Sequence, residues 1–187
     1  MSGSPYVDGV TRVSMRRRLS FWLSVLIIAV LVSRLLWSLE QEAERAERAS
    51  VRQVLNQVRA TLVIKTATLQ LPRQEPMATV WAGANPMNWM QGAPGNYSGI
   101  CVSPSALASG HWCYQRFYGD GGVLVYRSRD IGTIEGQAAD REGLFRWRVR
   151  LNFEDRNGNG RFDRGDRLIG LELVRWWPAP ENGKGQG

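Results

Sequence analysis

The most apolar stretch of the chain runs from Leu19 to Leu39, where the sequence reads LSFWLSVLIIAVLVSRLLWSL. A helix needs roughly 20 such residues to cross a hydrocarbon layer of about 30 Å, so the pattern predicts a membrane span. A buried core helix is the alternative, but so small a chain offers no other helix that could cover an apolar surface on every side. The one charge inside the stretch, Arg34, lies towards its end, where a long side chain reaches the headgroups.

From Glu40 to Leu71 the apolar residues are reduced to one stripe of an otherwise polar helix. They recur near the 3.6-residue helical period, so another part of the chain must cover this face. Because no Gly or Pro interrupts residues 19–71, we predict one helix that continues from the span and stops at Pro72. The residues of the stripe are Val51, Leu55, Val58, Leu62 and Leu69.

Beyond Pro76 the sequence changes to short β-type runs that are separated by Gly, Pro and Asn turn signals. The fold class that follows is α+β, with the long N-terminal helix packed on an antiparallel sheet. The expected strands are Ala78–Trp81, His111–Phe117, Val123–Arg127, Leu144–Phe153 and Leu168–Trp177.

The fourth expected strand alternates between large apolar and polar side chains. This is the period of a strand with one face in the core and the other in water. Its polar face carries Arg146, Arg148 and Arg150, which form either ordinary solvated surface or a docking face for an acidic neighbouring subunit. A nucleic-acid site is not indicated, because the aromatic side chains of the strand point to the other face.

The chain has 187 residues and a net charge of +7, which leaves room for an anchor and one modest domain. Its one tight basic cluster, Arg16, Arg17 and Arg18, comes directly before the apolar stretch and indicates topology rather than phosphate binding. By the positive-inside rule the cluster is cytoplasmic and the residues after the span lie outside. No small-x-small cleavage site follows the apolar core, so we expect the anchor to be retained.

These features predict five segments of an inner-membrane protein that crosses the bilayer once. Residues 1–15 show no periodicity, which indicates an irregular lead or a mis-assigned start with Met15 as the first residue. The segments are a cytoplasmic lead over 1–18, the span over 19–39, its amphipathic extension over 40–71, a periplasmic β-rich domain over 72–177 and a flexible tail over 178–187.

Cys101 and Cys113 are the two cysteines of the chain, and both are expected to face an oxidising compartment. Their spacing suits one local disulfide, which contributes on the order of 3 kcal/mol in the chain-entropy model. Two free thiols are the alternative, since the CxxC spacing of metal and redox sites is absent.

A twelve-residue run from Asp155 to Asp166 predicts a calcium loop, because oxygen-bearing side chains stand at its positions 1, 3, 5, 9 and 12. Gly160 occupies the sharp turn, and the last position has Asp where Glu is usual. With strands instead of helices on both sides, we expect a calcium-stapled hairpin of weak affinity; an ordinary Asn-Gly turn is the alternative. The expected ligands are Asp155, Asn157, Asn159, the backbone carbonyl of Arg161, Asp163 and Asp166.

The sequence does not indicate an enzyme. The single histidine, His111, lies beside Trp112 and Cys113 in an expected strand, with no nucleophile elbow nearby. No Gly-rich phosphate loop and no zinc-ligand spacing occurs in the chain.

The layout resembles that of type IV pilins and the pseudopilins of type II secretion, in which an apolar N-terminal helix continues into an amphipathic half and an antiparallel sheet follows. Among these proteins it is most similar to the minor, non-standard subunits of mannose-sensitive haemagglutinin-type pili. The segments that resemble their NP, NYxG, GxWxY and GxLVY series are Asn85-Pro86-Met87, Asn96-Tyr97-Ser98-Gly99, Gly110-His111-Trp112-Cys113-Tyr114 and Gly122-Val123-Leu124-Val125-Tyr126-Arg127.

The resemblance implies a minor pilin-like subunit that takes part in assembly or priming of a pilus or pseudopilus. Its implied partners are other pilin or pseudopilin subunits, inner-membrane platform proteins and the membrane, with no nucleic acid. Residues 18–23 lack the Gly before the cleavage point and the Glu at the fifth mature position that standard prepilins share. The alternative function is a membrane-anchored calcium-binding envelope or adhesion module unrelated to pilus assembly; an anchored hydrolase is a third class.

Overall fold

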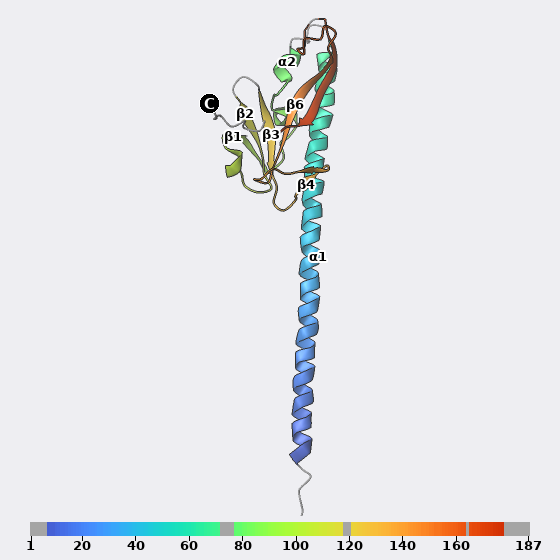
Figure 1. The fold of residues 1–187 in the computed structure, drawn as a ribbon, viewed down its shortest axis with the longest axis vertical. Coiled ribbons are helices and arrows are strands. Elements are labelled where there is room, and N and C mark those ends of the chain that lie inside the picture. Colours follow the sequence, from blue (N-terminus) through green and yellow to red (C-terminus); the bar gives the residue numbers. More distant parts are fainter. Residues whose placement is uncertain (1–6, 72–76, 118–120, 164, 178–187) are drawn as a thin grey trace, which may run out of the picture. The chain divides into compact units, whose positions relative to one another are not determined.

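The computed structural model describes the backbone of residues 7–71, 77–117, 121–163 and 165–177, with side chains from residue 20 onward except residue 40. It divides into two compact units, Met1–Ala46 and Glu47–Gly187. The fold class is α+β, as predicted: a long N-terminal helix and a five-stranded, mostly antiparallel sheet (Figure 1). The expected tail, residues 178–187, lies outside the described residues.

Helix α1 spans Val7–Leu69 and ends just before Pro72. The expectation of an irregular lead is wrong from Val7 onward, because a helix that is already nucleated extends at small cost per added residue. In the first unit every described large apolar side chain is exposed, including Phe21, Trp22 and Leu39. Within the described residues, α1 alone is long and apolar enough to cross a membrane or to act as a signal.

In the second unit the predicted stripe of α1 is buried in the main core. The exposed fraction is at most 1% for Val51, Leu55, Val58, Leu62 and Leu69. These side chains pack with Trp112, Leu124, Tyr126, Phe145, Trp147 and Val149 of the sheet. The helical period of the sequence therefore identified the covered face of the helix correctly.

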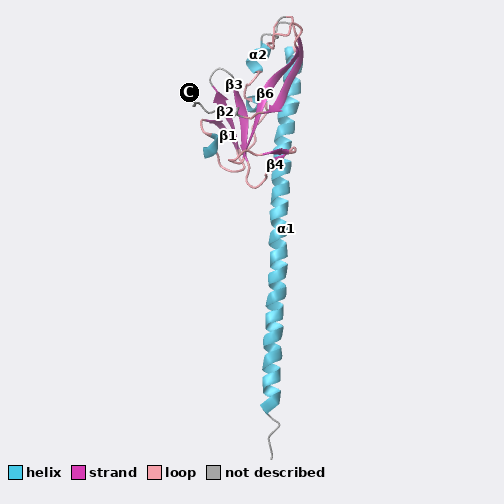
Figure 2. Cartoon of the chain, viewed as in Figure 1, coloured by secondary structure: helices cyan, strands magenta, loops and turns pink. Residues whose placement is uncertain are grey.

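The sheet has the order β1-β2-β3-β6-β7 (Figure 2). Its strands are β1 (Tyr97–Cys101), β2 (Trp112–Phe117), β3 (Gly121–Arg127), β6 (Leu144–Glu154) and β7 (Arg167–Arg175). β4 (Thr133–Ile134) and β5 (Gln137–Ala138) form a separate two-stranded hairpin. Four of the five expected strands are thus confirmed, while β1 pairs parallel with β2 and makes the sheet mixed.

The expected strand at Ala78–Trp81 is wrong, because these residues form the short helix α2 (Met77–Trp81). A run of four residues is too short to show a helical or strand period, and its β-branched residues Thr79 and Val80 suggest a strand only weakly. Packing against the rest of the domain therefore decides its structure. Lys65 of α1 places its ammonium 5.0 Å from the ring centre of Trp81 and 5.7 Å from that of Trp89, which follows in the 3-10 helix η1 (Pro86–Trp89). This cation–π contact fastens both short helices to α1.

Gly83, two residues after α2, forms hydrogen bonds to both β3 and β6 at the point where these strands no longer pair with each other. Its N–H donates to the Val149 carbonyl of β6 at 2.7 Å, and its carbonyl accepts from the Gly122 N–H of β3 at 2.8 Å. A Cβ on Gly121 would lie 2.7 Å from the Gly83 carbonyl oxygen, so this close approach requires glycine. Tyr114 also donates its hydroxyl hydrogen to Gly83, which completes the local hydrogen bonding.

Candidate functional site

The face of α1 opposite the buried stripe is exposed in the second unit. We define this outward face by Ala49, Gln53, Asn56, Ala60 and Val63, all of which are exposed. Successive members are four and three residues apart, so they stand in one row along the helix. Ala side chains let another helix approach closely, and exposed amides offer it hydrogen bonds.

The outward face becomes more apolar towards the end of α1. Val63 and Ile64 are each 68% exposed, and Ile169 of strand β7 is 53% exposed beside them. A shallow groove runs between helix and strand here, lined by Val63, Thr66, Ile169 and Gly170 among others. This face was not predicted from the sequence; the signal that indicates it is the alternating spacing of four and three residues along the row.

Thr66 closes the edge of the sheet next to this groove. Its Oγ1 accepts a hydrogen bond of 2.9 Å from the Leu171 N–H, which no neighbouring strand reaches. An open strand edge invites pairing with another chain, and a side-chain cap of this kind blocks that pairing. A partner that binds in this groove would therefore contact mainly side chains, because the Leu171 N–H is already hydrogen-bonded.

The hairpin β4–β5 is pinned to α1 by an ion pair. Arg59 donates from both terminal nitrogens to the two carboxylate oxygens of Glu135 at 2.7 Å each. This contact raises the pKa of Arg59 and lowers that of Glu135, with the hydrogen bond as the largest cause in both. Ile134, the neighbouring residue of the hairpin, is buried in the same core as the helix stripe.

The loop 155–166 lies between β6 and β7, so the prediction of flanking strands is right. Asp155 accepts from the N–H groups of Gly158 and Gly160 at 2.7 Å each. Asp166 accepts from the N–H groups of Arg156 at 3.0 Å and Asp163 at 2.9 Å. The loop is thereby folded around its own carboxylates.

Asp163 stands at the centre of this loop. One of its oxygens accepts from the side-chain amides of Asn157 at 2.6 Å and Asn159 at 2.9 Å, and the other from the Gly165 N–H at 2.9 Å. The Gly165 N–H and the two amides hold the pKa of Asp163 below its usual value. Phe162 anchors the loop to the domain, with its ring centre 5.5 Å from that of Phe153.

The donor set of this loop fits a hard cation such as Ca²⁺, which prefers carboxylate, amide and backbone oxygens. Asp155, Asn157, Asn159, Asp163 and Asp166 would supply the side-chain oxygens, and Arg161 would supply a backbone carbonyl. Within the described residues, however, no group of three or more His, Cys, Asp or Glu side chains is close enough to hold a metal ion. Binding would thus depend on the asparagine and backbone oxygens as well as on the carboxylates.

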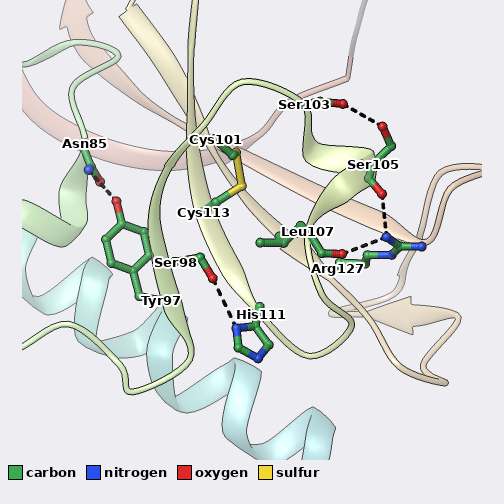
Figure 3. Close-up of a disulfide and its surroundings, with 10 residues drawn as sticks. All are labelled: Asn85, Tyr97, Ser98, Cys101, Ser103, Ser105, Leu107, His111, Cys113 and Arg127. Atoms are coloured by element: carbon green, nitrogen blue, oxygen red, sulfur yellow. Dashed lines mark hydrogen bonds between the residues drawn. A yellow bond between two sulfur atoms is a disulfide. The ribbon is translucent and has the colours of Figure 1, made fainter.

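Cys101 and Cys113 form a disulfide between the edge strand β1 and β2, as predicted (Figure 3). Near it, Ser98 Oγ lies 3.2 Å from His111 Nδ1, and the two side chains point towards each other (Figure 3). Arg127 donates to the carbonyls of Ser105 and Leu107 at 2.6 and 2.8 Å, which fixes the connection between the two strands. The disulfide and these hydrogen bonds hold β1, β2 and their connection together, which indicates a structural role for this region.

The segments that carried the family resemblance have structural partners. Asn85 caps helix η1 through the Met87 N–H at 3.1 Å and donates to the Tyr97 hydroxyl at 2.8 Å. Asn96 donates to the Gly110 carbonyl at 2.6 Å, which joins the NYxG and GxWxY segments. These residues thus position β1 on β2.

The arginines of β6 are engaged within the domain. Arg146 pairs with Asp140 and is only 12% exposed, while Arg150 pairs with Glu172 at 2.5 Å. Arg148 also has partners. A docking face at Arg146, Arg148 and Arg150 stays a prediction, and an acidic partner would compete there with the contacts that these arginines already make within the domain.

The side chains of Arg16, Arg17 and Arg18 lie outside the described part, so their topological role stays a prediction.

A long N-terminal apolar helix packed on a mixed sheet that carries a disulfide is consistent with a pilin-like fold. Comparison with known proteins adds no relative: no family model, curated protein or solved structure matches the chain.

Proposed function

We propose that this protein is a minor pilin-like subunit that is anchored in the inner membrane with its second unit in the periplasm. Its role is assembly or priming of a type IV pilus, of the mannose-sensitive haemagglutinin type, or of a type II secretion pseudopilus. The main support is that α1 has a fully buried stripe and an exposed outward face in the second unit, and that an apolar segment of membrane-spanning length precedes them in the same helix.

The partners we propose are the helices of other pilin or pseudopilin subunits and the inner-membrane platform proteins. A helix that contributes one face to its own core has its opposite face available to a neighbour. Small side chains at Ala49 and Ala60 permit close helix contact, and Val63 supplies apolar area. This docking role needs no chemistry at a catalytic centre, in keeping with the proposal of a non-enzymatic protein.

Co-purification from native membranes tests this function. A tagged chain should recover pilin-like and platform proteins, and Val63→Asp should reduce that recovery by placing a charge in the contact. Val102→Asp is the matched control, since Val102 is also a valine, is 95% exposed and follows Cys101 of the disulfide. Recovery that is free of pilin-like and platform proteins, or equal loss in both variants, would contradict the proposal.

We also propose that the loop 155–166 binds Ca²⁺ as a structural staple. The support is its donor set and the self-bonded loop fold around Asp155, Asp163 and Asp166. This observation also favours the second candidate function, a membrane-anchored calcium-binding envelope or adhesion module. Genes for a pilus next to this one would favour the first function over the second.

Melting curves in millimolar Ca²⁺ and in excess chelator test the calcium proposal, because binding to the native state adds RT ln(1 + [L]/Kd) to its stability. The melting temperature should rise by several degrees with Ca²⁺, and Asp163→Ala should abolish the rise. Asp130→Ala, which changes an exposed Asp outside the loop, should keep it. Identical curves with and without Ca²⁺ would contradict the staple and leave the docking function standing.

A further inference from the structure

Two adjacent Asn-Gly pairs, Asn157-Gly158 and Asn159-Gly160, lie in the exposed loop between β6 and β7. An Asn-Gly pair deamidates readily because no side chain shields the glycine nitrogen. That nitrogen attacks Cγ of the asparagine: the N–Cγ bond forms, the Cγ–Nδ2 bond breaks, and ammonia leaves with the proton of the N–H group. Water then opens the resulting succinimide to aspartate or isoaspartate.

One carboxylate holds both attacking nitrogens. The Gly158 N–H donates to Asp155 Oδ1 and the Gly160 N–H to Asp155 Oδ2, each at 2.7 Å. Hydrogen bonds to an ionised acceptor are stronger than those between neutral groups. Either glycine nitrogen must give up such a bond before it can turn towards the asparagine side chain.

The two asparagine side chains are also held in place. Their Nδ2 groups donate to Asp163 Oδ2 at 2.6 Å from Asn157 and 2.9 Å from Asn159. Their Oδ1 atoms accept from the backbone N–H groups of Asn159 at 3.0 Å and Arg161 at 2.7 Å. Each amide is therefore fixed by a donor and by an acceptor, which resists the rotation that ring closure requires.

We propose that Asp155 protects both Asn-Gly pairs from deamidation, so that the loop is a latent modification site controlled by this carboxylate. Conversion of either asparagine would replace an amide donor to Asp163 with a second negative charge. Like charges at hydrogen-bond distance repel, so the modified loop would open unless a cation entered it. The proposal itself requires no metal.

Deamidation of the full chain in detergent, with excess chelator and mildly alkaline buffer, tests this proposal by peptide mass mapping. The sequence contains a third pair, Asn182-Gly183, which serves as an internal reference in the same molecule. Asp155→Ala should raise the rates at Asn157 and Asn159 by on the order of tenfold, since a charge-assisted bond no longer has to break. The rate at Asn182 should stay unchanged.

Asp163→Ala is the matched control, because it removes the amide contacts and keeps both bonds to Asp155; its effect on the rates should be smaller. Should Asp155→Ala lose its cooperative melt, Asp155→Asn gives the test, and its rates at both positions must exceed those of the wild type. Rates at Asn157 and Asn159 that rise no more than the rate at Asn182 would overturn the proposal. So would wild-type rates equal to those of the chain unfolded in urea.

Discussion

The Tyr126 hydroxyl of β3 donates a hydrogen bond of 2.6 Å to Glu47 Oε1 of α1. The same carboxylate accepts from the Arg129 N–H at 2.8 Å and from the Asp130 N–H at 3.4 Å. One helix residue therefore fixes both the end of β3 and the loop after it. The outward face of α1 keeps its orientation on the domain partly through this contact.

This contact predicts a loss of stability in alkali. Burial, then the hydrogen bond to Glu47, raises the pKa of Tyr126 above its ordinary value of 10.0. The unfolded chain thus loses the tyrosine proton at a lower pH than the folded chain, so stability is full below that value and falls as pH rises above it. Urea unfolding of Tyr126→Phe should show about 1 kcal/mol less stability at neutral pH and a weaker alkaline loss. An unchanged alkaline slope would contradict this assignment.

Asp140 predicts a complementary loss of stability in acid. Burial alone would raise its pKa, but the Leu144 N–H at 2.8 Å, the Arg146 side chain and the Glu142 N–H at 2.9 Å together lower it. Its contribution is present above the usual value of 3.8 and is lost as pH falls below it. Asp140→Asn should flatten the acid limb of the stability curve, as measured by urea unfolding across that pH range. A limb as steep as in the wild type would refute this role.

The pair Arg59 and Glu135 predicts that Glu135→Gly affects stability differently in two backgrounds. Glu135 has φ +50°, a conformation that costs energy for a residue with a side chain. In the wild type, Glu135→Gly loses the ion pair, worth about 0.5–1 kcal/mol after solvent screening, and this loss opposes the relief of backbone strain. In Arg59→Ala the pair is already gone, so Glu135→Gly should relieve strain and stabilise the domain. A double-mutant cycle by chemical denaturation measures both, and equal effects in the two backgrounds would exclude the coupling.

The contact between α1 and β7 at Gly170 is too close for a larger residue, which predicts a loss of stability on substitution. A Cβ added there would lie 2.7 Å from Thr66 Cγ2, so in Gly170→Ala either the Thr66 side chain, which accepts a hydrogen bond from the Leu171 N–H, or the strand must shift. We expect a loss of about 1–3 kcal/mol in the free energy of unfolding. Gly132→Ala is the control, since an added Cβ at Gly132 meets no atom within 4 Å. Equal stability of the two variants would contradict this prediction, because it would mean that the contact accommodates the added methyl group without cost.

Sequence patterns predicted the elements whose period is long enough to read. The stripe from Val51 to Leu69 and the alternation along β6 each repeat several times, and the face of each that packs in the main core was assigned correctly. The parallel pairing of β1 was not predictable, because Gly99 and a register shift interrupt its five residues. The hairpin β4–β5 was missed since its turn places Glu135 in a conformation typical of glycine, supported by Arg59 from 76 residues away.

The disulfide was predictable because its two cysteines are local in sequence, twelve residues apart. The loop 155–166 between two strands was also predictable, whereas its calcium binding stays a prediction. The engagement of Arg146 by Asp140 could not be read from the alternation of β6, because a turn outside the strand supplies the partner. The outward face of α1 emerged only when the opposite stripe was found buried in the domain.

The most direct test of the docking account is crosslinking in living cells from a photoreactive residue placed at Val63, with the same residue at Val102 as the comparison. The account predicts adducts at position 63 with the helix of a pilin-like subunit or with a platform protein, and none of these at position 102. Position 63 adducts that contain neither kind of protein, or the same adducts from both positions, would contradict the assignment of α1 as the docking surface.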